Sequence, residues 1–343
     1  MTSLHRKLLR ELWRMRGQAL AIAVVIAGGV AMLIMALSSF DSLTLTRDAF
    51  YRDYRFADVF ASLKRAPESL REPIEAIPGV QHVETRVVGG ANLDLPGFTD
   101  PVTAELVSLP DGRNAELNRL YLRAGRLPRA GHEAEAVVSE AFAAAHGLEP
   151  GDSLSAVING RGQRLEIVGI GLSPEYIYQI RPDDLFPDYE RYGVLWMNRT
   201  TLAHAFDMDG AFNNVVLTLT RDARVPDVLD RLDALLAPYG GARAIARKDQ
   251  LSHRYLEVEL EQLQVMATLF PAIFLGVAAF LLNVVLTRLI GTQRDQIAIL
   301  KAFGYGNRQV GLHYAELVLL IIAVGLALGI ALGLWLGGLV AEL

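Results

Sequence analysis

Long apolar runs and the polar segments between them divide this chain. Three runs, Ala19–Leu37, Val265–Leu286 and Leu317–Leu339, contain no charged residue. Each has roughly the 20 apolar residues that a helix needs to cross a hydrocarbon core. The first run is longer than the core of a secretory signal peptide, so we interpret it as a retained anchor. We predict transmembrane spans at residues 19–40, 265–287 and 316–340.

The segment between the second and third spans, residues 288–315, is polar and basic. Within it Ile297, Leu300 and Phe303 recur at a spacing that places them on one face of a helix, and Gly304 ends the pattern. The pattern predicts a short amphipathic helix. Periodicity alone leaves two interpretations open, a helix lying in the lipid headgroups or a helix that binds another protein.

A second amphipathic pattern precedes the first span. Leu4, Leu8, Leu12 and Met15 share one helical face, which Leu9 and Trp13 widen, and basic residues supply charge elsewhere, namely Arg6, Lys7, Arg10, Arg14 and Arg16. We predict a cytoplasmic amphipathic helix over residues 1–18, since basic residues beside a span remain in the cytoplasm.

Charge also gives a consistent topology for the spans. With the N-terminus inside, the segment 288–315 returns to the cytoplasm, and its excess of Arg288, Arg294, Lys301 and Arg308 over acidic residues agrees with that placement. The large region between the first two spans is then extracytoplasmic. Because the chain stops soon after the third span, we expect it to be a fragment or one half of a longer membrane protein.

The predicted fold class is membrane α-helical spans plus an α+β extracytoplasmic domain, residues 41–248, inserted between the first and second span. The most specific local signal is Asn159-Gly160 between two strand-like runs, which predicts a tight hairpin. Ser139 and Gly147 predict the two ends of a short helix. Further helices are predicted over residues 68–77, 200–206 and 225–236.

A stalk helix is predicted over residues 249–264. Leu256, Leu260 and Leu263 fall on one helical face, and no proline or glycine interrupts the run into the second span. The helix should therefore pass unbroken into the membrane, with Pro271 as a candidate kink inside it.

Four glycines of the third span, Gly325, Gly329, Gly333 and Gly337, are each four residues apart. This spacing puts them on one helical face, where small residues let a neighbouring helix approach closely. Glycine is also generally frequent in membrane helices, but the regular spacing favours a helix-packing surface.

Composition narrows the chemistry. The chain has 343 residues, a mean hydropathy of +0.27 and a net charge of −5, which suits a membrane protein with a large polar domain and argues against nucleic-acid binding. It has no cysteine, and its histidines show no metal-binding spacing, so no metal site is predicted. No phosphate-binding loop or nucleophile motif occurs. We therefore expect a protein that is not itself an enzyme.

An aromatic, proline-rich stretch, Ser173–Gly193, is the candidate contact for cargo or a partner in the external domain. An ordered loop of this kind is equally typical of internal packing. Its candidate residues are Tyr176, Tyr178, Phe186, Tyr189 and Tyr192.

The run Gln293–Glu316 resembles the FtsX-like permease domain shared by MacB-, FtsX- and LolC/LolE-type ABC transporter subunits. It reads RDQIAILKAFG where the family has a polar lead followed by EIGxLRAxG, with Gln296 and Ala298 departing from that pattern. The external domain is similar to the MacB-type periplasmic core domain through Ile77-Pro78-Gly79-Val80 and Gly125-Arg126-Leu127-Pro128, among other short motifs. The resemblance covers nearly the whole chain.

The resemblance implies a permease subunit of the mechanotransmission type. ATP and magnesium would bind a separate cytoplasmic cassette subunit, with no cofactor on this chain, and the movement would export or extract a lipid, lipoprotein, peptide or drug. Other implied partners are a second permease half or homologous subunit, membrane lipids and a periplasmic protein, at the bacterial inner membrane. The implied cassette-coupling residues are Arg294, Asp295, Ile297, Leu300, Lys301, Phe303, Gly304 and Arg308.

A second hypothesis comes from a different class. A membrane-anchored sensor would bind a ligand with the external domain and signal to a partner protein inside the cell. The segment 288–315 is too short for an output domain of its own, so the permease hypothesis is favoured.

Overall fold

The structure is a computed structural model that describes residues 10, 12–95, 98, 102–181 and 184–341. These form two compact units, one within Arg47–Val258 and one that combines the described residues up to Thr46 with those from Glu259 onward. Most of the predicted N-terminal helix, residues 1–9 and 11, lies outside the described residues, whereas residues 12–14 are helical. The two units are treated in turn.

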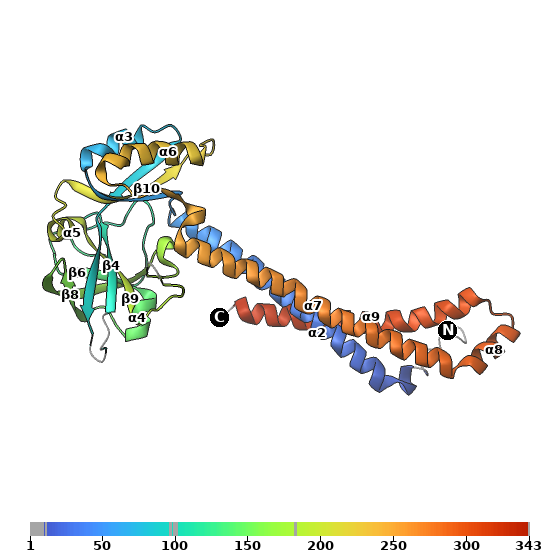
Figure 1. Cartoon of the computed structure of the whole chain (residues 1–343). Helices are drawn as coiled ribbons and strands as arrows, with labels where there is room; N and C mark the ends of the chain where they lie inside the picture. The colour runs from blue at the N-terminus through green and yellow to red at the C-terminus, as the bar shows by residue number, and fades with distance from the viewer. Residues whose placement is uncertain (1–9, 11, 96–97, 99–101, 182–183, 342–343) are drawn as a thin grey trace. The chain divides into compact units, whose positions relative to one another are not determined.

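The elements follow in chain order (Figure 1). The helices are α2 (Arg16–Asp53), α3 (Arg71–Glu75), α4 (Glu140–His146), α5 (Arg199–Ala205), α6 (Val225–Leu236), α7 (Leu251–Thr292), α8 (Arg294–Ala302) and α9 (Asn307–Ala341), with 3-10 turns η1 (Glu68–Leu70), η2 (Pro174–Tyr176), η3 (Ala237–Tyr239) and η4 (Arg247–Asp249). The strands are β1 (Val59–Pro67), β2 (Val80–Arg86), β3 (Val88–Asp94), β4 (Val102–Leu109), β5 (Tyr121–Gly125), β6 (Glu135–Ser139), β7 (Ser153–Ile158), β8 (Arg161–Leu172), β9 (Tyr192–Asn198), β10 (Ala211–Leu219) and β11 (Ile245–Ala246).

The domain unit contains a small antiparallel sheet in the order β11-β1-β10-β2. Helices α3 and α6 lie over this sheet, as Figure 1 shows. Val228, Leu232 and Leu236 of α6 repeat every four residues and are buried against the sheet. The N-terminal part of the domain sequence contributes β1, α3 and β2, and the C-terminal part contributes β10, α6 and β11. This layer is therefore a split βαβ arrangement.

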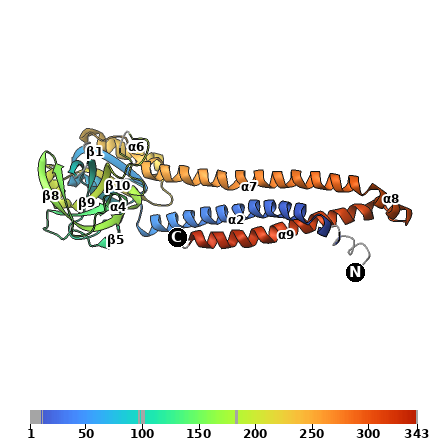
Figure 2. The same cartoon turned by 90° about the horizontal axis from the view of Figure 1, so that it is seen from below.

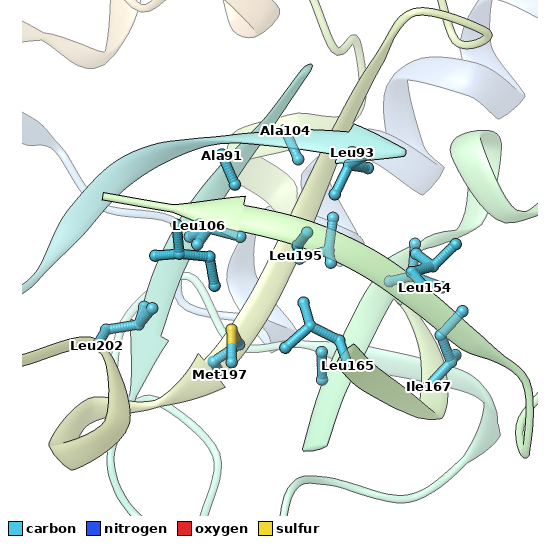
Figure 3. Close-up of a cluster of buried hydrophobic side chains, with 14 of the residues drawn as sticks. Ala91, Leu93, Ala104, Leu106, Leu154, Leu165, Ile167, Leu195, Met197 and Leu202 are labelled. Atoms are coloured by element: carbon cyan, nitrogen blue, oxygen red, sulfur yellow. The ribbon is translucent and has the colours of Figure 1, made fainter. Parts of the chain in front are cut away.

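The second sheet of the domain closes on itself. Its strand order is β5-β8-β6-β9-β4-β3-β7, and β7 also pairs with β8, so six strands form a barrel with β5 at its edge. Pairs β4–β9 and β6–β8 are parallel, and the others are antiparallel. Alternate side chains point inward and fill the interior (Figure 3), among them Leu93, Ala104, Leu106, Leu154, Leu165, Ile167, Leu195 and Met197.

The barrel is inserted within the small sheet. Strand β2 leads directly into β3, and the chain returns from α5 into β10, which pairs with β2. Arg86, the last residue of β2, lies opposite Asn214 of β10. The two ends of the insertion therefore meet on neighbouring strands.

The other unit holds three helices, α2, α7 and α9, that are long and apolar enough to cross a membrane. Side chains from all three form one buried cluster that includes Ile22, Ile26, Ala278, Leu317 and Ile321. Helix α7 continues through Pro271 without a break. Helix α2 continues to Asp53, well beyond the end predicted for the first span.

Several local predictions are confirmed, among them Ser139 and Gly147 as the residues that flank α4. Helix α6 and the β7–β8 hairpin occur where expected, and Asn159 and Gly160 both have the positive φ of a tight hairpin turn (47° and 77°). Ser139 precedes α4, but its side chain makes no cap hydrogen bond. Its buried hydroxyl instead accepts from Val194 N–H at 3.2 Å and donates to Gln179 Oε1 at 2.8 Å.

Candidate functional site

The predicted amphipathic turn forms helix α8, and hydrogen bonds fix its end. Gly304 N–H donates to Lys301 O (3.0 Å) and Tyr305 N–H donates to Leu300 O (3.2 Å), which is the Schellman pattern. Gly304 supplies the left-handed conformation that this pattern requires, with φ +91°. The glycine therefore ends α8 and turns the chain toward α9.

Helix α9 begins with a side-chain cap of its own. The Gln309 side chain accepts from Gly306 N–H at 3.0 Å, as the third helical residue of a capping box does. Gln293 lies between α7 and α8. Its Oε1 accepts the hydroxyl proton of Tyr314, in α9, at 2.8 Å, and both side chains are buried. These contacts hold α8 in a defined connection between the two long helices.

The charged residues predicted for coupling lie exposed on and beside α8. Arg294, Asp295, Lys301 and Arg308 are all exposed, and within the described residues none of them forms an ion pair. They are available to a binding partner.

The apolar side chains of α8 divide differently from the prediction. Ile297 and Leu300 are half-buried, whereas Phe303 is 80% exposed and follows the last residue of the helix. Ile299, which sequence reasoning missed, is 56% exposed and lies four residues before Phe303. That spacing places Ile299 and Phe303 side by side. The exposed apolar contact of this segment is therefore the pair Ile299 and Phe303.

The four glycines of α9 lie against α2, and the two helices run alongside each other in Figure 2. A Cβ added at Gly325, Gly329 or Gly333 would lie within 3 Å of an α2 side chain. At Gly337 the nearest α2 atom would be 3.6 Å away. The closest partners, in the same order, are Ile26 (2.8 Å), Val30 (2.7 Å), Ile34 (2.9 Å) and Ser38.

These partners also give the direction of the helices. Each step of four residues along α9 is matched by a step of four along α2, so the two helices are parallel. Parallel packing is what the first and third spans of one chain require when a single span lies between them. The carbonyl oxygens of Ala23, Ala27 and Ala31 lie about 3 Å from the same Cβ positions, which brings the backbones close enough for weak Cα–H···O contacts.

The predicted stalk residues differ in burial. Leu256 packs against the domain cluster that contains Tyr51, Phe56 and Leu117. Leu260 is 5% exposed, but Leu263 is 43% exposed and lies outside the buried face.

The start of α7 is also bound by polar contacts within the domain unit. Arg47 at the end of α2 forms an ion pair with Glu257, and Tyr51 Oη lies 3.0 Å from His253 Nδ1. Burial lowers the pKa of His253 below its usual range. Tyr178 N–H donates to Ser252 Oγ at 2.9 Å. This end of α7 is thus tied to both α2 and the segment that follows β8.

A buried carboxylate, Glu175, is the centre of the contacts at this end of α7. Arg86 donates to both of its oxygens, at 2.6 and 2.9 Å, and Asn118 Nδ2 donates at 2.6 Å. Gln250 Nε2 donates to the Glu175 carbonyl at 2.8 Å. Burial alone would lower the pKa of Arg86, but the adjacent Glu175 carboxylate outweighs it and raises that pKa. Arg86 comes from the small sheet, so Glu175 joins that sheet to the beginning of α7.

Sequence reasoning did not find this cluster. Arg86, Asn118 and Glu175 are far apart in the chain, and no spacing rule relates them. Only the Ser173-Pro174 start of η2, where Ser173 Oγ accepts from Glu175 N–H, carried a local signal.

The aromatic loop has two parts. Tyr176 and Tyr192 donate their hydroxyl protons to the two oxygens of Glu105, at 2.8 and 2.7 Å, and Tyr178 packs on Tyr255. Burial is the main cause that raises the pKa of Glu105. These tyrosines therefore stabilise the domain.

The other part of the loop is open to solvent. Phe186 is 71% exposed and the neighbouring Leu185 is 83% exposed, whereas Tyr189 is half-buried. Of the five predicted contact residues, Phe186 is the one presented at the surface, and Leu185 joins it.

Residues 268–343 match the family described as FtsX-like permease C-terminal. No match was found among curated proteins.

Solved structures similar to this chain include three domains of permeases or transporters. The extracellular domain of the noncanonic ABC-type transporter YknZ from Gram-positive bacteria is 12% identical, with a TM-score of 0.36, over 55% of this chain and 98% of that one. The periplasmic region of MacB from Actinobacillus actinomycetemcomitans is 10% identical, with a TM-score of 0.35, over 62% and 95%. A domain of a putative permease from Porphyromonas gingivalis is 14% identical, with a TM-score of 0.33, over 54% and 84%.

The matched residues begin in α7 and include all of α8 and α9. They contain Gln293–Glu316, the run on which the family was predicted from sequence. Residues 268–343 thus match the FtsX-like permease C-terminal family, in agreement with the family predicted from the sequence.

Proposed function

We propose that this chain is the permease subunit of an ABC transporter and that its segment Arg294–Gly304 binds a separate cytoplasmic cassette protein. The observation that carries the proposal is the exposed surface of α8, within the region that matches the permease family. It exposes Arg294 and Lys301 on one flank of the helix and the apolar pair Ile299 and Phe303 on the other. A short helix that exposes both basic and apolar side chains is typical of a protein-binding helix.

The mechanism would be mechanical. ATP and magnesium bind the cassette, and closure of the cassettes moves α8. Because α7 is one helix from Leu251 to Thr292, a displacement at its α8 end reaches the residues that contact the domain. The domain would then act on a lipid, lipoprotein, peptide or drug on its own side of the membrane, together with a second permease subunit.

Co-purification with the cassette tests the proposal. The charge reversal R294E/K301E and the truncation I299A/F303A should each weaken cassette binding by about tenfold or more, since both remove contacts central to the surface. The basal ATPase rate of the cassette alone should be unchanged, and its stimulation by this chain should be lost.

Matched controls lie elsewhere on the chain. R113E/R224E reverses two exposed arginines of the domain, and L43A/L45A truncates two exposed leucines of α2. Both controls should bind the cassette as the unaltered chain does. If no cassette associates with the unaltered chain, the coupling role is wrong, and the ligand-sensor hypothesis becomes the one to test on the domain.

A further inference from the structure

A polar pocket lies between the helices on the α8 side of the membrane unit. Its volume is about 270 Å³. Arg14 and Gln18, four residues apart, line it from the N-terminal part of the chain. Arg288 and Thr292, also four residues apart, line it from the last turns of α7. Gln296 of α8 completes the polar side, so three helical segments contribute to one site.

The pocket is positively charged. Arg14 and Arg288 come from different segments, and no acidic side chain is among the lining residues. Within the part of the chain that the structure describes, neither arginine forms an ion pair. Two guanidinium groups that face one pocket without a carboxylate suit a phosphate group, which each can contact through paired N–H donors.

Gln293 provides a second, independent observation. Its side chain lines the pocket and is only 9% exposed. Its oxygen accepts the Tyr314 hydroxyl proton. The Nε2 group therefore remains as its donor, and among the described residues it has no acceptor. An amide donor that borders the pocket beside two arginines can donate to a phosphate oxygen placed there.

The start of α8 adds to the same preference. Gln293 is the residue before the helix and makes no side-chain cap hydrogen bond. Gln293 and Gln296 both line the pocket, so the first turn of α8 borders it. The N–H groups and the positive end of the helix dipole at that turn favour an anion.

The position of the pocket relative to the apolar spans indicates which kind of molecule supplies the phosphate. Gln18 immediately precedes the first apolar run, and Arg288 lies two residues after the last residue of the second. The pocket is thus at the edge of the hydrocarbon core, where phospholipid headgroups lie. Met15, Val285 and Leu289 form its apolar side. A lining that is polar on one side and apolar on the other fits an amphiphile better than a free ion.

We propose that this pocket binds the phosphate group of an anionic phospholipid, with Arg14 and Arg288 as its principal ligands. The apolar side contacts the glycerol and the first carbons of the acyl chains. The lipid then lies between α2, α7 and α8, where it stabilises the position of α8. This proposal does not depend on cassette binding and is tested without a cassette.

The test is titration of the detergent-purified full-length chain with phosphatidylglycerol, read by native mass spectrometry. One phosphatidylglycerol molecule per chain should be retained preferentially. R14Q/R288Q should weaken this binding about tenfold or more, since both charge-assisted contacts are lost. Q18E should weaken it as well, because it places a carboxylate in the pocket without removing either arginine.

The control R10Q/R308Q removes two basic charges next to the spans but outside the pocket, and it should bind phosphatidylglycerol as the unaltered chain does. Thermal unfolding of each variant without lipid verifies that it is folded. An equal loss of phosphatidylglycerol binding in the control and in the pocket variant would overturn the proposal. Lipid binding would then depend on the number of basic residues near the spans and not on the pocket.

Two further arms identify the ligand source. Diacylglycerol, which lacks the phosphate, should not bind in an arginine-dependent way. Inorganic phosphate at millimolar concentration should not displace the lipid. If inorganic phosphate binds through Arg14 and Arg288 and phosphatidylglycerol does not, the lipid assignment is overturned. The same holds if R14Q/R288Q leaves phosphatidylglycerol binding intact.

Discussion

At the scale of single residues, buried charges in the domain are held by specific partners. The Glu135 side chain is 3% exposed, and it accepts from Arg126 at 2.7 Å and from Arg129 at 2.7 Å (backbone N–H) and 2.9 Å (guanidinium). The Arg126 hydrogen bond is the main cause that holds the pKa of Glu135 well below its usual range. The carboxylate therefore stabilises the folded barrel only when it is ionised.

This gives a pH prediction. A carboxyl group whose pKa is lowered by folding contributes stability above its unfolded pKa of about 4.3, and the contribution is lost as the pH falls below that value. The free energy of unfolding of the unaltered chain should therefore fall more steeply than that of E135Q between about pH 5 and pH 3. Urea unfolding can be followed by Trp196 fluorescence in a W13F/W335F background, since the chain has three tryptophans. Parallel pH profiles would contradict the prediction.

The pair Arg86 and Glu175 gives a stability prediction. Both side chains are buried, 5% and 8% exposed, so removing one leaves the other charged without its partner. R86M should lower the free energy of unfolding by about 3–5 kcal/mol. The double variant R86M/E175L should be less destabilised than R86M, because no isolated charge remains buried. An R86M/E175L chain that loses as much stability as the two single variants combined would contradict this account.

At the scale of elements, the glycines of α9 make the close packing on α2 possible. G329V should lower the melting temperature of the detergent-solubilised chain, because its Cβ would lie 2.7 Å from Val30 Cβ and 2.9 Å from the Ala27 carbonyl oxygen. Gly338 is the matched control, since no atom lies within 4 Å of its Cβ position, and G338V should leave the melting temperature unchanged. Equal effects of the two valine substitutions would refute the packing role.

Features that depend on the spacing of neighbouring residues could be predicted from the sequence. Examples are the glycine face of α9, the Asn159-Gly160 turn and the amphipathic helix α6, because each is determined by residues close together in the chain. What could not be predicted depends on contacts between distant residues. The closure of the barrel rests on β7 pairing with both β3 and β8, and the Ser139 hydroxyl bonds Gln179 rather than its own helix.

The coupling segment shows the same limit. Its helix and its end at Gly304 follow from local sequence. Which apolar side chains stay exposed depends on what α7 and α9 cover, so the exposed Ile299 was not identified from periodicity. The polar pocket likewise combines residues from both ends of the chain.

At the scale of the whole molecule, the proposed mechanism depends on the stiffness of α7. Glu261 and Gln262 are exposed positions within this helix. E261G/Q262G should weaken the helix locally by about 1 kcal/mol per glycine. We expect cassette binding and ATP hydrolysis to persist, while ATP-dependent changes in hydrogen exchange over residues 251–258 disappear.

The matched control is E261A/Q262A, which removes the same side chains but keeps helix propensity. It should retain the ATP-dependent change in exchange. If the glycine variant retains it too, the signal does not travel through a rigid α7, and the mechanical part of the proposal is wrong.

The insertion of the barrel between β2 and β10 has a consequence for how such a domain can change. Arg86 and Asn214 lie opposite each other on paired strands, so the whole barrel occupies the position of a hairpin turn. Glu175, which pairs with Arg86 of the small sheet and accepts from Gln250 just before α7, lies within this insertion. Any module that replaced the barrel would therefore have to supply a carboxylate at the same point. Lineages of such a chain could acquire new recognition properties by exchanging one segment and conserving the rest.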